Sequence, residues 1–137
     1  FRSPKKNKNF GKKSVVLISR EEGSGTRGAF VELFGIEMKN AEGKKVDFTS
    51  EEADITNSTE VMLTSIAGNK YAIGYVSLGS LNKTVKALKI EGVSPSVSSI
   101  KNGTYKISRP FNIVTKQTGL SENAFLSEVF VFFRSGK

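Results

Sequence analysis

One stretch near the start of the chain constrains the fold more than any other. An apolar, β-branched run from Val15 to Ile18 predicts a buried strand, and a glycine-rich turn follows at 23–28. Apolar residues then recur at helical spacing, at Phe30, Leu33 and Phe34. A strand that runs through a tight turn into a helix presents unpaired backbone N–H groups at one point. The stretch therefore predicts a binding site for a small tetrahedral oxyanion.

The side chains of this stretch favour the same ligand. Arg20 ends the predicted strand, and a guanidinium can donate two hydrogen bonds to one oxyanion. Ser24 and Thr26 add hydroxyl donors, and Gly25 lets its backbone N–H approach an ion closely because it has no Cβ. The helix dipole also favours a negative charge here. The alternative is a plain tight turn with Ser24 as the helix N-cap.

Two acidic residues, Glu21 and Glu22, stand beside this turn, where a carboxylate would repel an anion. We expect one of them, Glu22 rather than Glu21, to pair with an arginine and hold it in place. The alternative is a solvated carboxylate near the start of a helix.

The composition excludes several kinds of chemistry. The 137 residues include no Cys and no His, which excludes thiol catalysis, histidine acid–base catalysis and zinc sites of the usual kind. No apolar run approaches the ~18 residues of a membrane span. The net charge is +8, with a dense lysine cluster inside the aperiodic residues 1–13. We interpret these residues as a solvated linker or arm, because only clustering on one face would favour nucleic acid.

The rest of the chain alternates predicted helices and strands, which is typical of an α/β layered sheet. Residues 37–57 predict a polar surface loop with a short strand at 46–48, and Asn57-Ser-Thr59 can cap a second helix that ends near Gly68. A strand over 71–76 contains Gly74, where backbones can approach closely.

The later elements have weaker signals. We expect a helical turn at 78–81, a strand at 84–90, a weak helical turn within 92–103, and a strand over 105–116 interrupted at 108–110. From Ser121 onward the sequence predicts a helix with a broad apolar stripe. That stripe consists of Phe125, Leu126, Val129, Phe130 and Phe133.

Gly23-x-Gly25-x-x-Gly28 also matches the dinucleotide-binding pattern. That site needs an acidic residue ~20 positions later, after the next strand. Asp47 stands near that distance, but no convincing strand precedes it. A nucleotide- or phosphometabolite-binding enzyme domain therefore remains an alternative. The lack of His, Cys and any metal-ligand cluster argues against an enzyme, so we expect no catalytic residue, no metal and no cofactor.

Four stretches, in this order, resemble the phosphate-binding proteins of bacterial high-affinity phosphate ABC transporters. They are Ser19–Phe30, Asn57–Val61, Ala72–Val76 and Ser108–Asn112. The similarity runs from about Val15 to Lys116, most of the chain. It implies an α/β chain that forms one lobe of a type II periplasmic-binding-protein fold, with a mixed central sheet and flanking helices. It also implies an extracytoplasmic location, in the periplasm or at the cell surface, with a lipid anchor left open.

The resemblance assigns roles to individual residues. Arg20, Ser24, Gly25 and Thr26 match the positions that bind phosphate in this family. The position two after the arginine is usually acidic in the family, and Glu22 stands there. Arg27 is not one of the ligands, so we expect it to support them from behind or to face solvent.

A whole family member is much longer than this chain, so the resemblance implies half of a binding site. Residues 14–109 would be the second lobe, after the linker at 1–13. Residues 110–137 would be a crossover strand and a C-terminal helix that belong with the first lobe. The missing first lobe, or a second copy of this chain, would cover the helix at Phe125–Phe133. The implied partners are inorganic phosphate and a membrane ABC permease, with no nucleic acid.

Overall fold

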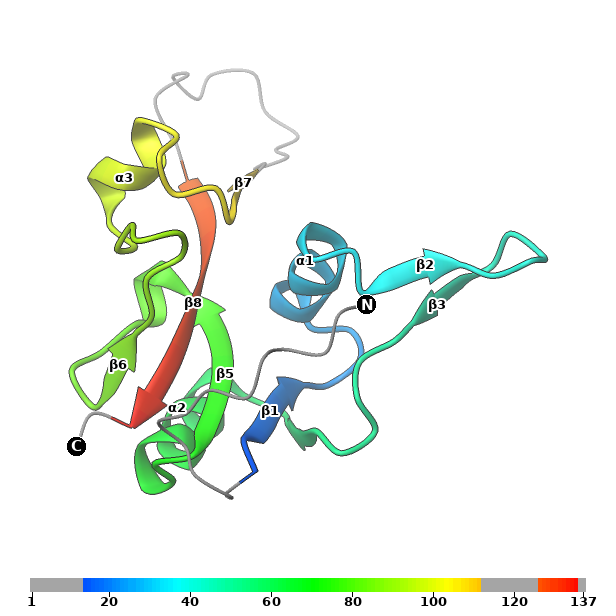
Figure 1. The fold of residues 1–137 in the computed structure, drawn as a ribbon, viewed down its shortest axis with the longest axis horizontal. Coiled ribbons are helices and arrows are strands. Elements are labelled where there is room, and N and C mark those ends of the chain that lie inside the picture. The colour runs from blue at the N-terminus through cyan, green and yellow to red at the C-terminus, as the bar shows by residue number, and fades with distance from the viewer. Residues whose placement is uncertain (1–13, 112–125, 136–137) are drawn as a thin grey trace, which may run out of the picture.

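The structure is a computed structural model that describes residues 14–111 and 126–135. Its centre is a mixed sheet with strand order β4-β1-β5-β8-β6, with β7 paired to β8 beside this path (Figure 1). β1, β4 and β5 run parallel, whereas β8 is antiparallel to β5, β6 and β7. The strands are β1 (Val16–Arg20), β4 (Asp54–Thr56), β5 (Ala72–Ser77), β6 (Val85–Ala87), β7 (Ser108–Phe111) and β8 (Leu126–Ser135).

Helices α1 (Gly25–Leu33) and α2 (Thr59–Gly68) cover opposite faces of this sheet. Successive side chains of a strand alternate between faces, so Ala72, Gly74 and Val76 face α2 whereas Tyr75 faces α1. The shorter elements are η2 (Leu78–Ser80), α3 (Val97–Lys101) and a protruding hairpin of β2 (Glu37–Lys39) and β3 (Lys45–Asp47), seen at the right of Figure 1. No helix among the described residues is long and apolar enough to cross a bilayer.

The close approach expected at Gly74 is present, and side chains of α2 supply two of the three nearest atoms. A Cβ at this position would lie 2.6 Å from Met62 Sδ, 2.7 Å from Ile66 Cδ1 and 3.2 Å from the Ile18 carbonyl oxygen. Met62 and Ile66 are completely buried. Glycine therefore lets α2 pack directly onto β5, and a side chain here would push the helix away from the sheet.

Most of the expected elements are confirmed. The first strand, the helix that begins after Ser24, the second helix, the strand around Gly74 and the helical turn at Leu78 all lie within about two residues of their predicted positions. Residues 37–57 differ, because the polar segment contains the β2–β3 hairpin and also β4, which extends the sheet beside β1. The short strand expected at 46–48 is confirmed as β3, within one residue. The sequence does not reveal β2 and β4, because period-two alternation is weak in three-residue strands.

The predicted C-terminal helix is wrong where the structure describes it. Residues 126–135 form β8, whose backbone pairs with β5 from Gly74↔Phe133 to Ser77↔Phe130. The run at 129–133 contains only valine and phenylalanine, which favour strands, and a short apolar run fits both periods. The helix that a first lobe or a second copy was expected to cover is therefore absent from this segment. The linker at 1–13 and the expected start of that helix, Ser121 to Phe125, lie outside the described residues.

Candidate anion-binding site

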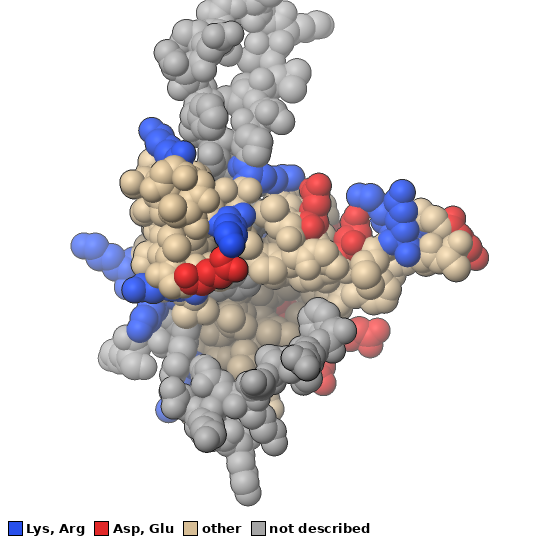
Figure 2. Space-filling model, turned by 45° about the horizontal axis from the view of Figure 1, so that its top comes forward, with Lys and Arg blue, Asp and Glu red and all other residues tan. Residues whose placement is uncertain are grey.

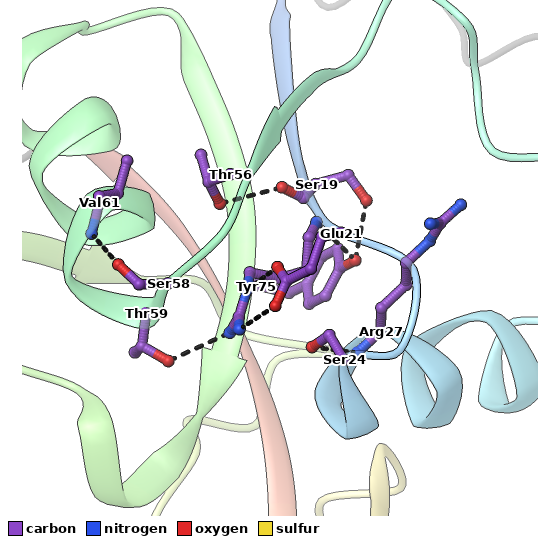
Figure 3. Close-up of polar contacts among 10 residues, drawn as sticks. Ser19, Glu21, Ser24, Arg27, Thr56, Ser58, Thr59, Val61 and Tyr75 are labelled. Atoms are coloured by element: carbon purple, nitrogen blue, oxygen red, sulfur yellow. Dashed lines mark hydrogen bonds and ion pairs between the residues drawn. The ribbon is translucent and has the colours of Figure 1, made fainter.

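Two helices begin at the same edge of the sheet, because β1 and β4 are parallel neighbours and a helix follows each of them. Ser24 caps α1, and its Oγ accepts a hydrogen bond from the Arg27 N–H at 3.3 Å. Ser58 caps α2 and accepts from the Val61 N–H at 3.1 Å. Figure 3 shows both caps at this edge, with Glu21 and Tyr75 between them in that view. The first N–H groups of both helices therefore face the region beyond the end of β1.

The turn between β1 and α1 depends on glycine. Gly23 has a φ of +86°, a conformation that strains any residue with a Cβ. At Gly25 a Cβ would meet no atom within 4 Å, so the space beside the first residue of α1 is open. Ser24 and Thr26 are half-buried beside it. The predicted ligands on this turn thus lie next to open space at a helix N-terminus.

The guanidinium of Arg20 is held on two edges. Its Nε and Nη2 donate to the two carboxylate oxygens of Glu21 at 2.8 and 3.0 Å, and Nη1 donates to Thr59 Oγ1 at 3.1 Å. The Arg20 side chain is only 11% exposed. Three of its five N–H groups thus have partners among the described residues, and two donors remain for a ligand.

The pair with Glu21 also fixes the charges. The hydrogen bond to Glu21 raises the pKa of Arg20 above its ordinary value, although burial acts in the opposite direction. The hydrogen bond from Arg20 lowers the pKa of Glu21. Both groups are therefore ionised near neutral pH, and the carboxylate orients the arginine.

The arginine partner is Glu21, so the expectation that it would be Glu22 is wrong. β1 ends at Arg20, and a turn begins at Glu22. The carboxylate of Glu21 can therefore curve back onto its neighbour. Glu22 is exposed in the turn that follows.

Arg27 does not face solvent. Its side chain is 14% exposed, and its Nη2 donates to Asp47 Oδ2 at 2.7 Å, which joins α1 to β3. The Arg27 side chain points away from Glu21 and Tyr75 (Figure 3), and its buried Nε has no hydrogen-bond partner among the described residues. Arg27 therefore connects α1 to the hairpin and is not aimed at the open space.

Asp47 is committed to the same contact. Besides Arg27, it accepts hydrogen bonds from the Thr49 N–H at 2.7 Å and the Thr49 hydroxyl at 2.6 Å. Burial alone would raise the pKa of Asp47, but these hydrogen bonds and the charge of Arg27 outweigh it, so the pKa is lowered. Because β3 belongs to a separate hairpin, Asp47 does not stand at the end of the sheet strand that a dinucleotide site would need.

Sequence reasoning missed a group of polar residues behind Arg20. Ser19, Thr56 and Tyr75 are all more than nine-tenths buried. Ser19 Oγ lies 2.8 Å from the Tyr75 hydroxyl, and Thr56 donates to the Ser19 carbonyl at 3.1 Å (Figure 3). Thr59 contacts Arg20, whereas the sequence predicts only a helix-capping role for it. The one available signal was register, since Tyr75 follows Ser19 by the same 56 positions that separate paired residues of β1 and β5.

A cavity adjoins this polar group, since Ser19 and Tyr75 line part of it. Its volume is about 600 Å³, on the α1 face of the sheet, between Phe30, Tyr75, Leu17, Met38 and Phe48. Neither an acidic nor a basic side chain lines it, so it offers no cation to pair with an oxyanion. The part of the chain that the structure describes also holds no group of three or more acidic side chains placed to share a metal ion.

Comparison with known proteins decides the family. A sequence model described as a PBP superfamily domain matches residues 6–135. The chain belongs to the PBP superfamily. This result confirms the fold class that the sequence indicated, one with a mixed central sheet and flanking helices.

Within the PBP superfamily the similar proteins share one description. "Phosphate-binding protein PstS 2" of Streptococcus agalactiae serotype V is 64% identical over 106 residues, which are 77% of this chain and 36% of that protein. A crystal structure of a phosphate-binding protein of a phosphate ABC transporter from Streptococcus pneumoniae TIGR4 has a TM-score of 0.69 at 52% identity, over 72% of this chain and 38% of that one. An ABC-type phosphate transport receptor from Vibrio cholerae has a TM-score of 0.66 at 27% identity, over 90% and 41%. The chain thus spans about a third of the length of the curated relatives it matches.

Proposed function

We propose that this chain binds inorganic phosphate between Arg20 and the N-terminus of α1. It would do so as part of the extracytoplasmic solute-binding protein of an ABC phosphate importer. One observation carries the proposal. The Arg20 guanidinium is fixed by Glu21 and Thr59, keeps two donors, and follows β1 directly into the turn that begins α1. The 64% identical streptococcal relative, a phosphate-binding protein, supports the choice of phosphate.

The proposed ligand set consists almost entirely of hydrogen-bond donors. Arg20 supplies a guanidinium, Ser24 and Thr26 supply hydroxyls, and the first residues of α1 from Gly25 supply backbone N–H groups. Such a set suits an ion with several acceptor oxygens. Because the ligands lie on one side of the ion, we expect weak binding with a Kd on the order of millimolar. A Kd below one micromolar would contradict binding by this half-site alone.

The roles of the whole protein are part of the same proposal. Residues 14–109 would be the lobe that carries the site, and a membrane ABC permease would receive the phosphate. The location would be the periplasm or the cell surface, and the ligand would undergo no chemistry. Among the described residues, β7 and β8 pair within this sheet, so the proposal keeps 108–111 and 126–135 with this lobe.

Calorimetric titration of the 137-residue chain with sodium phosphate at constant ionic strength tests the proposal. We expect saturable binding that Arg20→Ala abolishes. The matched control is Arg109→Ala, which removes an arginine that contacts Glu32 at 3.7 Å and should leave phosphate binding unchanged. Equal binding by the wild type and Arg20→Ala would refute the proposed site.

Calorimetric titration with a nucleotide and with duplex DNA tests the two alternative functions, an enzyme domain and a nucleic-acid-binding domain. Binding of a nucleotide without binding of free phosphate would favour the glycine-turn enzyme domain. Binding of duplex DNA with a steep salt dependence would favour a nucleic-acid surface. We expect neither, because Asp47 is paired with Arg27 and because the face shown in Figure 2 carries Asp and Glu as well as Lys and Arg side chains.

A further inference from the structure

The Tyr75 hydroxyl takes the place of a strand partner at the end of β1. The Glu21 N–H donates to the Thr56 carbonyl of β4 at 3.0 Å. Because successive N–H groups of a strand point to opposite sides, the Arg20 N–H points toward β5. Ladder pairing with β5 involves Val16 and Leu17 and stops before Arg20. The Arg20 N–H therefore meets no β5 carbonyl, and it donates to Tyr75 Oη at 3.3 Å.

A second bond from the same hydroxyl fixes the residue before Arg20. Ser19 Oγ and Tyr75 Oη lie 2.8 Å apart, and both residues are at least 96% buried because Ser19 is 4% and Tyr75 3% exposed. Because both residues are buried, each bond restrains the backbone more than it would at the surface. One side chain thus holds the last two residues of β1 from the side.

The ring of Tyr75 contacts the other half of the proposed site. It stacks on Phe30 with ring centroids 4.0 Å apart and an interplanar angle of 4°, and it packs with the fully buried Ala29. Ala29 and Phe30 lie one helical turn after Gly25 and Thr26, so each pair shares a face of α1. The Tyr75 ring therefore supports the same side of α1 that presents the expected phosphate ligands.

We propose that Tyr75 is a positioning residue for the phosphate site, setting Arg20 against the N-terminus of α1. The proposal rests on the proposed phosphate function for its binding readout. Tyr75 is too buried to touch the ion, so it acts through the Arg20 backbone and through α1. Neither the phosphate-site motif nor the helix pattern in the sequence gives this residue a role.

Tyr75→Phe is the sharpest test, because it keeps the ring and its stack on Phe30 and removes only the hydroxyl. We expect the phosphate Kd to rise about three- to tenfold, the effect of losing one or two buried hydrogen bonds. The matched control is Tyr105→Phe, because Tyr105 is 1% exposed and packs with the α2-side core. It should lower the unfolding temperature and leave the Kd unchanged. Equal Kd values for Tyr75→Phe and the wild type would overturn the proposal.

Backbone amide NMR of the ligand-free chain gives a readout that does not depend on phosphate. Tyr75→Phe should speed hydrogen exchange at the Arg20 amide and shift the Ser24, Gly25 and Thr26 signals, whereas Tyr105→Phe should not. If the wild type binds no phosphate, the proposed function fails, and unmoved Ser24–Thr26 signals would then overturn the positioning role by themselves. If Tyr75→Phe does not fold, Ser19→Ala decides, since it removes the 2.8 Å contact and should shift the same amides.

Discussion

Arg20 and Arg27 stand seven positions apart in one motif, and the structure uses them differently. Both are mostly buried, at 11% and 14% exposure, and both contact a carboxylate, at 2.8 and 2.7 Å. Glu21 is the sequence neighbour of Arg20 and orients it beside two helix N-termini. Asp47 is twenty positions from Arg27 and draws its side chain toward the hairpin. Charge and burial alone therefore do not show which arginine binds the anion. The position of the carboxylate that holds each arginine distinguishes them.

The largest difference should appear when Arg27 is replaced. Arg27→Leu removes the contact between α1 and β3 and leaves the Asp47 carboxylate with Thr49 alone. We expect the free energy of unfolding to fall by about 2 kcal/mol, because a charged hydrogen-bond partner is lost. The phosphate Kd should stay within about twofold of the wild type. Urea unfolding and calorimetry measure the two quantities. A loss of phosphate binding without a loss of stability would reverse the roles assigned to the two arginines.

A smaller effect should distinguish the two adjacent glutamates. Glu21→Gln removes the charge and one arm of the two-pronged contact, so the Arg20 Nε–H should exchange with solvent about tenfold faster. Glu22→Gln is the matched control and should leave this exchange rate unchanged, because Glu22 is exposed in the turn. Side-chain NMR of arginine Nε–H groups measures the rate. The reverse pattern would mean that Glu22 holds Arg20 in solution.

The smallest expected effect is on the pH dependence of stability in acid. The pKa of Asp47 in the folded chain lies below its unfolded value, despite burial, because of Thr49 and Arg27. Its ionised form therefore contributes full stability above the ordinary Asp pKa of about 4, and this contribution disappears as the pH falls through the folded pKa. Asp47→Asn should flatten the pH dependence of stability below about pH 4, by less than about 1 kcal/mol. Thermal unfolding from pH 3 to 6 measures it, and identical slopes for both chains would contradict the ion pair.

The sequence was most informative where a structure depends on neighbouring residues. The strand, the glycine turn and the capped helix at 15–34 depend on side chains a few positions apart, and all three were predictable. The residues that contact Arg20 were less predictable, because Thr59 and Tyr75 lie 39 and 55 positions away in the sequence. No local pattern contains such contacts, although parallel register places Tyr75 beside Ser19.

The prediction of a helix in the C-terminal segment was wrong for a different reason. Five of the seven apolar residues at 125–133 fit one face of a helix, and the valines and phenylalanines also suit a strand. The segment forms a strand because β8 lies between β5 and β6 and pairs with both. The space between those two strands therefore selects the strand over the helix. That space exists only once the sheet has formed, so it leaves no signal in the segment itself.

The strand order has a consequence for how the chain acquires its structure during synthesis. β8 comes last among the strands but sits between β5 and β6, which are joined to each other only across it. A ribosome must therefore deliver residues 126–135 before this half of the sheet can close, while β1, β4 and β5 can pair earlier. Such late, long-distance closure slows folding and leaves β5 with an open edge in the meantime. Nascent chains halted before residue 126 should consequently be more prone to associate with one another than the finished product.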